Sequence, residues 1–225
     1  MALNVGFLVF PNVQQLDLTG PYEVFASAGM AVHLIWKALD PVQSATGLML
    51  TPTVTLEDCP QLDVICIPGG GGVNALLTDG EVLDFVRRQA AGARFVTSVC
   101  TGSLVLGMAG LLRGRRATSH WNAVDLLPRL GAIPTEGRVV RDGNVVTAGG
   151  VTSGIDFGLA LLAELQGEAV ARRVQLALEY APAPPFDSGT PETAAPELVA
   201  LARQRMAGSR AERERLLPPL EPAGQ

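Results

Sequence analysis

The chain has 225 residues, of which 48% are hydrophobic and 17% charged, with a formal net charge of −5. This length and composition suit one globular α/β domain and exclude a disordered chain, and the acidic balance argues against a nucleic-acid-binding protein. No apolar run reaches the ~20 residues of a membrane span, and the first residues do not form a secretion signal. Three widely spaced cysteines without a C-x-x-C pair indicate a cytoplasmic protein with neither disulfides nor a zinc site.

The first elements place an acid near the end of a strand. The apolar run Val5–Phe10 predicts a central strand that is buried on both faces. A loop over residues 13–21 then leads to a helix that begins near Pro21, a favoured first helical residue. Asp17 lies in this loop between two leucines, at the carboxyl side of the first strand. Its ordinary role is that of a loop or cap aspartate, and a functional acid is the alternative.

Two further strands follow, and the second ends in glycines. Val32–Lys37 and Val64–Ile67 are predicted strands, separated by a hairpin or edge segment around Pro52. The four glycines at 69–72 match neither a phosphate loop nor a dinucleotide fingerprint. They form either a tight turn or a set of N–H donors for a developing negative charge, with Gly70 and Gly71 as candidates.

A cysteine stands at the next junction between a strand and a helix. The segment Arg94–Val99 predicts a buried strand and Leu104–Leu112 a buried helix, with Cys100 at the turn. A side chain there stands at the carboxyl edge of the sheet, where open α/β folds bind ligands. The nearby helix N-terminus favours a thiolate, as in a nucleophile elbow. The alternative is that Cys100 is simply a small buried residue.

The segment after this elbow supplies the second histidine and another glycine-rich turn. A basic turn at 113–116 is predicted to be solvated surface. The stretch 117–130 is interpreted as a short strand that runs into a helix and carries His120, which either serves Cys100 as a base or packs as an aromatic. A hairpin is predicted at 139–146. The Gly-rich junction at 147–154 opens two successive helices, so three turns converge on one rim.

The composition changes after residue 180. Residues 181–191 are proline-rich and predicted to be extended, followed by a short helix over 196–206 and a charged tail at 210–215. We therefore expect a single α/β catalytic domain over 1–180. Residues 181–225 form an arm whose short helix packs on this domain or on a partner subunit.

Taken together, these motifs resemble the DJ/ThiJ/PfpI superfamily of class I glutamine amidotransferase-like proteins. Within it the chain resembles most the bacterial isocyanide hydratases. The resemblance covers nearly the whole chain, and its most specific stretches are Phe7–Pro11, Val13–Pro21, Val99–Gly107 and Leu178–Phe186. It implies a flavodoxin-like fold: an open, mostly parallel sheet with helices on both faces and a nucleophile elbow.

The resemblance also implies roles for individual residues. Cys100 matches the nucleophile, Asp17 the acid, and Thr101 a threonine that supports turnover. Val151 falls where a backbone N–H approaches the sulfur, and the family often has isoleucine there. With the backbone N–H groups of Gly70 and Gly71, that of Val151 is expected to stabilise the sulfur and the developing charge.

The implied activity is hydration of a small-molecule isocyanide to an N-substituted formamide through a thioimidate, with no metal or organic cofactor and in a homodimer. Asp17 must hold a proton for this, so we expect an apolar pocket and a neighbouring anion to raise its pKa. The alternatives are a glyoxalase or deglycase, for which His120 would be deployed near the cysteine, and a redox sensor based on Cys100.

Overall fold

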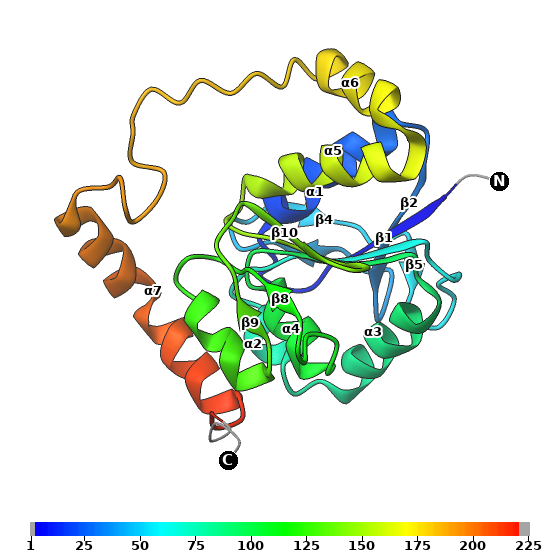
Figure 1. The fold of residues 1–225 in the computed structure, drawn as a ribbon. Coiled ribbons are helices and arrows are strands. Elements are labelled where there is room, and N and C mark those ends of the chain that lie inside the picture. Colours follow the sequence, from blue (N-terminus) through cyan, green and yellow to red (C-terminus); the bar gives the residue numbers. More distant parts are fainter. Residues whose placement is uncertain (1–2, 221–225) are drawn as a thin grey trace.

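The apolar runs form the strands of a seven-stranded sheet in the middle of the molecule (Figure 1). The structure is a computed structural model and describes residues 3–220. In spatial order the strands of this sheet are β10 (Val139–Asp142), β11 (Val145–Ala148), β7 (Phe95–Val99), β6 (Val64–Ile67), β1 (Asn4–Leu8), β2 (Ala31–Trp36) and β5 (Val54–Thr55). Neighbouring strands run parallel except for the antiparallel β10–β11 hairpin. The expected open, mostly parallel sheet is confirmed.

Helices cover both faces of this sheet (Figure 1). One layer consists of α1 (Gln15–Ser27), α5 (Ser153–Gln166) and α6 (Glu168–Ala177). The other consists of α2 (Val73–Leu76), α3 (Gly80–Gly92), α4 (Gly102–Met108) and the 3-10 helix η1 (Val124–Leu130). Side chains of β6 alternate between the two cores, with Val64 and Cys66 on the α1/α5 side and Ile65 and Ile67 on the other. A strand buried on both faces therefore needs a continuous apolar run.

The first helix begins earlier than the sequence predicts. α1 starts at Gln15, so Asp17 lies in its first turn instead of in a loop, and Pro21 lies inside the helix. An internal proline removes a backbone hydrogen bond. Packing between helices compensates, because a Cβ on Gly154 of α5 would lie only 2.9 Å from Cδ of Pro21. Packing between α1 and α5 therefore outweighs the preference of proline for the first position of a helix.

Several short elements border the sheet. The segment around residue 50 forms a hairpin of β3 (Val42–Gln43) and β4 (Met49–Leu50), next to the edge strand β5. The region after 115 has only a two-residue strand, β8 (Arg116–Ala117), which pairs with β9 (Ile133–Pro134), and η1 replaces the predicted helix.

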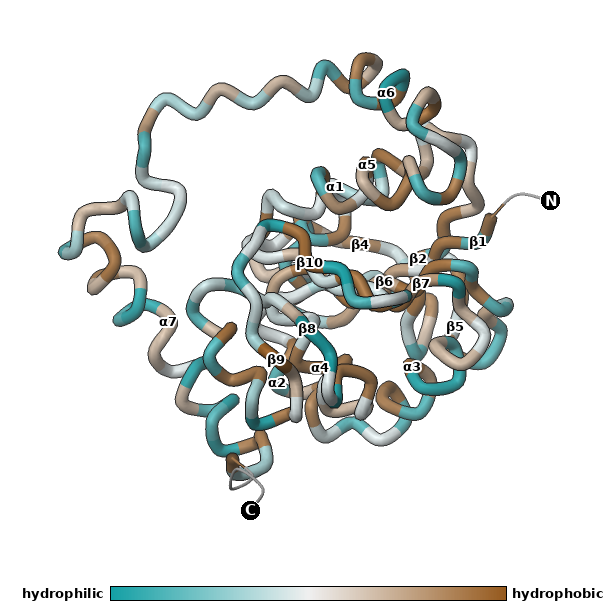
Figure 2. Tube along the Cα trace, in the orientation of Figure 1, coloured by the Kyte–Doolittle hydropathy of each residue, from teal (hydrophilic) through white to brown (hydrophobic). Residues whose placement is uncertain are grey.

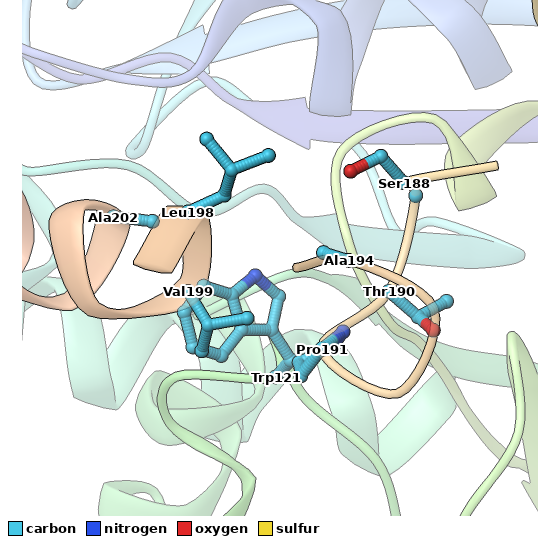
Figure 3. A pocket seen from close by; sticks show the side chains of 9 residues that line it. Trp121, Ser188, Thr190, Pro191, Ala194, Leu198, Val199 and Ala202 are labelled. Atoms are coloured by element: carbon cyan, nitrogen blue, oxygen red, sulfur yellow. The ribbon is translucent and has the colours of Figure 1, made fainter. Parts of the chain in front are cut away.

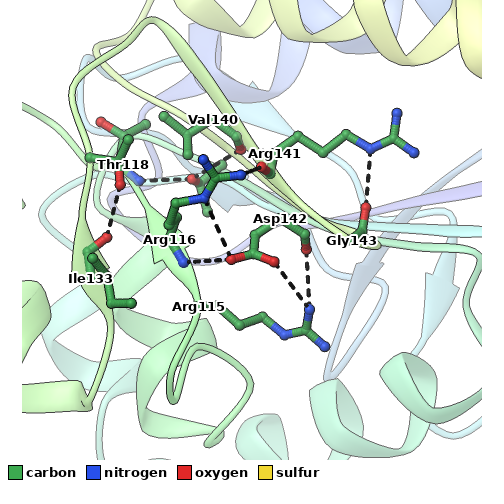
Figure 4. A network of polar contacts seen from close by, with 10 residues as sticks. Arg115, Arg116, Thr118, Ile133, Val140, Arg141, Asp142 and Gly143 are labelled. Atoms are coloured by element: carbon green, nitrogen blue, oxygen red, sulfur yellow. Dashed lines mark hydrogen bonds and ion pairs between the residues drawn. The ribbon is translucent and has the colours of Figure 1, made fainter.

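The basic turn before β8 is fixed to the sheet and is not simply solvated (Figure 4). The backbone N–H of Arg116 donates to Oδ2 of Asp142 at 2.9 Å, and Nη1 of Arg115 donates to the carbonyl oxygen of Asp142 at 3.2 Å. The backbone N–H of Thr118 donates to Oγ1 of Thr147 at 2.9 Å. These bonds hold the segment before His120 against the β10–β11 hairpin.

The C-terminal region connects the helical layer that contains α6 with the opposite side of the molecule. An exposed linker leaves α6 and arches away from the body before α7 (Pro196–Leu216), which returns and packs beside α2 (Figure 1). Hydrophobic colouring appears on the central strands and on the helices beside them, whereas the linker is mostly pale or hydrophilic (Figure 2). α7 has 21 residues, so it is longer than predicted and includes the segment interpreted as a charged tail.

Candidate active site

Cys100 occupies a strained turn between β7 and α4. Its φ of +57° is in the left-handed region, which is unusual for a residue with a side chain. Its backbone N–H donates to the carbonyls of Ala148 (3.0 Å) and Gly149 (2.8 Å). Its own carbonyl accepts from the hydroxyls of Ser103 (3.2 Å) and Ser119 (3.1 Å). Both backbone polar groups are satisfied, and these bonds hold the strained conformation in place.

Gly102 allows this turn to approach the end of β6. A Cβ on Gly102 would lie 1.9 Å from the carbonyl oxygen of Ile67. Only glycine fits at that separation. The elbow and the glycine-rich loop after β6 are therefore packed directly against each other.

Cys100 is a buried residue with a small exposed fraction. The residue is 6% exposed, whereas Cys66 is 0% exposed. Burial and the charge of Asp17 raise the pKa of the Cys100 thiol well above its usual value, while the N–H and hydroxyl of Thr101 and the charge of Arg213 oppose the rise. The expectation of a thiolate favoured by the helix N-terminus is therefore wrong for the isolated thiol, because α4 has only seven residues and desolvation outweighs its influence.

Asp17 is placed beside this thiol by the first turn of α1. It is 0% exposed, and its Oδ2 accepts the backbone N–H of Gly69 at 2.8 Å. Burial raises the pKa of Asp17 to about 7, against the opposing hydrogen bonds from Gly69 and from the Cys100 thiol. A raised pKa of Asp17 was expected. Its main cause is desolvation and not a neighbouring anion. Within residues 3–220, Oδ1 of Asp17 has no hydrogen-bond partner.

Gly69 forms the contact between the acid and the elbow, and the sequence reasoning missed it. Its carbonyl accepts the backbone N–H of Gln14 at 2.9 Å. A Cβ on Gly69 would lie 2.6 Å from the nitrogen of Thr101 and 2.9 Å from Oδ2 of Asp17. The sequence feature that could have identified Gly69 is its position as the first glycine after the buried strand β6.

The backbone donors singled out from the sequence have different surroundings. The N–H of Gly70 donates to Oγ1 of Thr101 at 3.1 Å, so this donor acts on the threonine and not on the sulfur. Gly71 is exposed, and Val151 is half-buried in the turn before α5. The groups that affect the ionisation of the Cys100 thiol include the N–H and hydroxyl of Thr101, which lower its pKa, and the charge of Asp17, which raises it.

His120 is a neutral, largely buried histidine. Its Nδ1 accepts the backbone N–H of Asn122 at 3.2 Å, and its ring packs on Trp121 with 5.4 Å between centroids. Burial, together with the charge of Arg213, lowers the pKa of His120 to about 4. None of the hydrogen bonds found for His120 between residues 3 and 220 reaches Cys100.

Arg213 also reaches this region, although the sequence reasoning placed it in a charged tail. It is 7% exposed, and it contacts the glycine-rich loop from α7. The signal that could have found it is its helical spacing from other residues that face the body: Met206, Arg210 and Leu217 lie three, four or seven positions away.

A cavity of about 310 Å³ lies between Trp121, the linker and the start of α7, and neither Cys100 nor Asp17 lines it (Figure 3). Trp121 forms one wall, the linker at 188–191 another, and the first turns of α7 contribute Leu198 and Val199. Trp121 directly follows His120 in the chain, so the cavity adjoins the segment that carries the histidine.

No group of three or more His, Cys, Asp or Glu side chains suited to a metal ion is found among residues 3–220. None of the helices in that range combines the length and the apolar character needed to span a bilayer.

Known proteins are similar to this chain in sequence and in fold. The DJ-1/PfpI family profile matches residues 4–164. The isonitrile hydratase of Pseudomonas putida is 66% identical over 210 residues, which cover 93% of this chain and 92% of the relative. The crystal structure of a THiJ/PfpI family protein from Pseudomonas syringae superposes with a TM-score of 0.93 at 43% identity, covering 96% of this chain and 90% of the other. A glutathione-independent glyoxalase of Caenorhabditis elegans is 25% identical over 69% of this chain and 84% of its own length.

Proposed function

The chain belongs to the DJ-1/PfpI family, and from this premise we propose that it is an isocyanide (isonitrile) hydratase with Cys100 as nucleophile and Asp17 as acid. The observation that carries the proposal is the buried carboxyl group of Asp17, held by Gly69 against the elbow that carries Cys100, in a chain 66% identical to an isonitrile hydratase. The substrate is a small isocyanide, and the product is an N-substituted formamide.

The thiol and the carboxyl group act as a pair that shares one proton. Burial raises the pKa of both groups, so the pair holds a proton near neutral pH. Moving that proton from sulfur to Asp17 leaves the net charge unchanged and produces a thiolate beside a carboxylic acid. The reactive form therefore does not require a thiol with a low pKa of its own.

The reaction proceeds in two balanced halves. The Cys100 sulfur forms a bond to the terminal carbon of the isocyanide while Asp17 protonates that same carbon, which gives a thioimidate. Water then adds across the C=N bond, with its hydroxyl going to carbon and a proton to nitrogen. The C–S bond breaks, the formamide leaves, and the hydroxyl proton returns to the Cys100–Asp17 pair.

Backbone and hydroxyl groups support these steps. Thr101 directs its N–H and hydroxyl toward the sulfur, and Gly70 holds the Thr101 hydroxyl. We assign the backbone N–H groups of Gly71 and Val151 to the charge that develops on the substrate once it is bound. No cofactor is needed, because the nucleophile and the proton both come from side chains.

Two other activities receive less support from the geometry. A glyoxalase or deglycase would use a histidine near the cysteine, but the hydrogen bond found for the His120 ring among residues 3–220 leads to Asn122 and not to Cys100. Redox sensing favours an accessible thiolate, whereas Cys100 is nearly enclosed and its thiol has a raised pKa.

We further propose that the protein works as a cytoplasmic homodimer. Its three cysteines are all free thiols, which suits a reducing compartment. We assign residues 1–180 to the catalytic domain and residues 181–225 to the arm that carries α7; residues 1–2 and 221–225 of these two segments lie outside the described range.

The decisive experiment uses purified protein and p-nitrophenyl isocyanide, with the product identified by mass. Wild type should form the formamide, and Cys100→Ala should form none above background. Absence of formamide with the wild-type protein would reject the substrate assignment, and turnover of methylglyoxal above that of the isocyanide would favour glyoxalase activity.

A further inference from the structure

Arg213 is a buried cation whose direct partners are neutral groups. Its Nε donates to Oδ1 of Asn74 at 2.8 Å, and its Nη2 donates to the carbonyl oxygen of Gly70 at 3.1 Å. The residue is 7% exposed. Burying a guanidinium is costly unless an opposite charge compensates for the lost hydration. Among the ion pairs between residues 3 and 220, none joins Arg213 to a carboxylate.

The charged and titratable groups around Arg213 point to its partner. On α7 itself, Arg210 repels it, whereas Glu212 attracts it and also accepts a hydrogen bond from Asn74. From the body of the protein, His120 has a lowered pKa, and Cys100 attracts Arg213 whenever its thiol is ionised. Asp17 faces the same thiol from α1. The negative charge shared by Cys100 and Asp17 is therefore the one that Arg213 can compensate.

The backbone of Gly70 connects the two sites physically. Its carbonyl, which belongs to the peptide bond with Gly71, accepts a hydrogen bond from Arg213, and its N–H, which belongs to the peptide bond with Gly69, donates to the hydroxyl of Thr101. Gly70 has φ of +126°, and a Cβ there would lie 2.5 Å from the carbonyl oxygen of Asn12. The loop is therefore closely packed at Gly70, and the bond from Arg213 to its carbonyl helps to fix the N–H that meets Thr101.

We propose that Arg213 is a positioning residue for the nucleophile: its guanidinium fixes the backbone of Gly70, whose N–H orients Thr101, and its charge stabilises the anionic form of the Cys100–Asp17 pair. The proposal deepens the proposed function, because it assigns part of the hydratase site to the C-terminal helix. The pH dependence of the thiol's reactivity does not involve an isocyanide, so it can be tested separately from the substrate.

Two substitutions separate the charge from the hydrogen bonds. Arg213→Gln keeps a side chain that can donate hydrogen bonds through its amide group, but it removes the charge. Arg213→Lys keeps the charge but removes the planar guanidinium, whose N–H groups bind two acceptors in a fixed geometry. The first measurement is the rate of iodoacetamide alkylation at Cys100 against pH, resolved from Cys59 and Cys66 by peptide mass. The second is kcat and KM for p-nitrophenyl isocyanide hydration.

We expect Arg213→Gln to move the alkylation midpoint of Cys100 upward by about one pH unit and to lower kcat about 10- to 100-fold, with KM changed less than about threefold. Arg213→Lys should keep the midpoint within about 0.3 pH unit of wild type while lowering kcat about fivefold or more. A folded Arg213→Gln protein with the wild-type midpoint and kcat overturns the proposal. If Arg213→Gln does not fold, a wild-type kcat in Arg213→Lys overturns the positioning role.

Two matched variants separate the effect of Arg213 from that of charge or docking elsewhere on α7. Arg215→Gln removes the same charge from an exposed position in the last turn of α7. It should leave the midpoint within about 0.3 pH unit and kcat within about twofold of wild type. Arg210→Gln breaks the ion pair with Asp125 that docks α7 on η1. If Arg210→Gln reproduces the full midpoint shift of Arg213→Gln, docking of the helix and not Arg213 itself accounts for the effect, and the proposal fails.

If wild type hydrates no isocyanide, the proposed function fails while the alkylation test of Arg213 still stands.

Discussion

Cys66 and Cys100 occupy two neighbouring strands and show what distinguishes a structural thiol from a candidate nucleophile. Cys66 lies within β6, opposite Thr97 of β7, and is completely buried. Cys100 lies three residues after Thr97, just past the end of β7, in a left-handed conformation. Burial raises the pKa of both thiols, to about 12 for Cys66. A perturbed pKa alone therefore does not mark the reactive cysteine.

The difference lies in what surrounds each sulfur. Cys66 interacts with a threonine hydroxyl in the middle of the sheet, where a substrate cannot enter. Cys100 stands at the strand end, beside a carboxyl group that can accept its proton and near the cation of Arg213. Strand-end position and a proton partner together define the site.

Replacing each cysteine by alanine is the most direct test of this comparison. Cys100→Ala should lower isocyanide turnover by about 10⁴-fold or more, because no other group can form the thioimidate. Cys66→Ala should keep kcat within about twofold and lower the free energy of unfolding by about 1 kcal/mol through a small cavity. Steady-state kinetics and urea unfolding measure the two effects. Equal losses of activity in both variants would remove the distinction between the two positions.

Replacing Asp17 by asparagine should give the next largest effect. We expect kcat to fall about 10²- to 10⁴-fold, because the acid that exchanges a proton with Cys100 is lost. Stability should move in the opposite direction. The pKa of Asp17 is raised from 3.8 to about 7, so the folded state binds this proton more tightly than the unfolded state. The wild-type free energy of unfolding therefore falls as pH rises from about 4 to about 7.

Asparagine at position 17 does not ionise, so Asp17→Asn removes the loss of stability that comes from ionising the buried carboxyl group. The Tm of Asp17→Asn should exceed that of wild type by about 2–6 °C at pH 8 and by less at pH 5, as measured by calorimetry. A gap that is the same at both pH values, or larger at pH 5, would contradict the assigned cause of the pKa shift.

Adding a methyl group at Gly69 should have a smaller effect on catalysis. Gly69→Ala forces Thr101 and Asp17 apart, because its Cβ would lie within 2.6 Å of the Thr101 nitrogen. We expect kcat/KM to fall roughly 10- to 100-fold, since small displacements of reacting groups are costly. Gly208→Ala is the control, because a Cβ there meets nothing within 4 Å. Similar kinetics for the two variants would show that the contact at Gly69 does not matter.

The sequence predicted the sheet and the position of the elbow because both depend on local patterns. Buried parallel strands require continuous apolar runs, and the glycines after Ile67 and Cys100 mark the ends of two adjacent strands. The expected raised pKa of Asp17 is also confirmed, because an acid among apolar residues in the first turn is desolvated.

Other features depend on contacts between distant segments and were not predicted. Pro21 signalled a helix start, but packing against α5 places it inside α1. The elbow signalled an ionised thiol, but the depth of burial that raises its pKa depends on the whole fold. Arg213 was assigned to a tail because nothing near it in the sequence shows that it meets Gly70, 143 positions away.

The exposed linker before α7 has a consequence for engineering the protein. Residues 181–190 are all exposed, and α7 docks through contacts of its own, including the ion pair of Arg210 with Asp125. Chain continuity there contributes little to the docked arrangement. A circular permutation or a two-fragment version opened in this linker should therefore keep its activity, whereas truncation before α7 would remove a cation from beside the nucleophile.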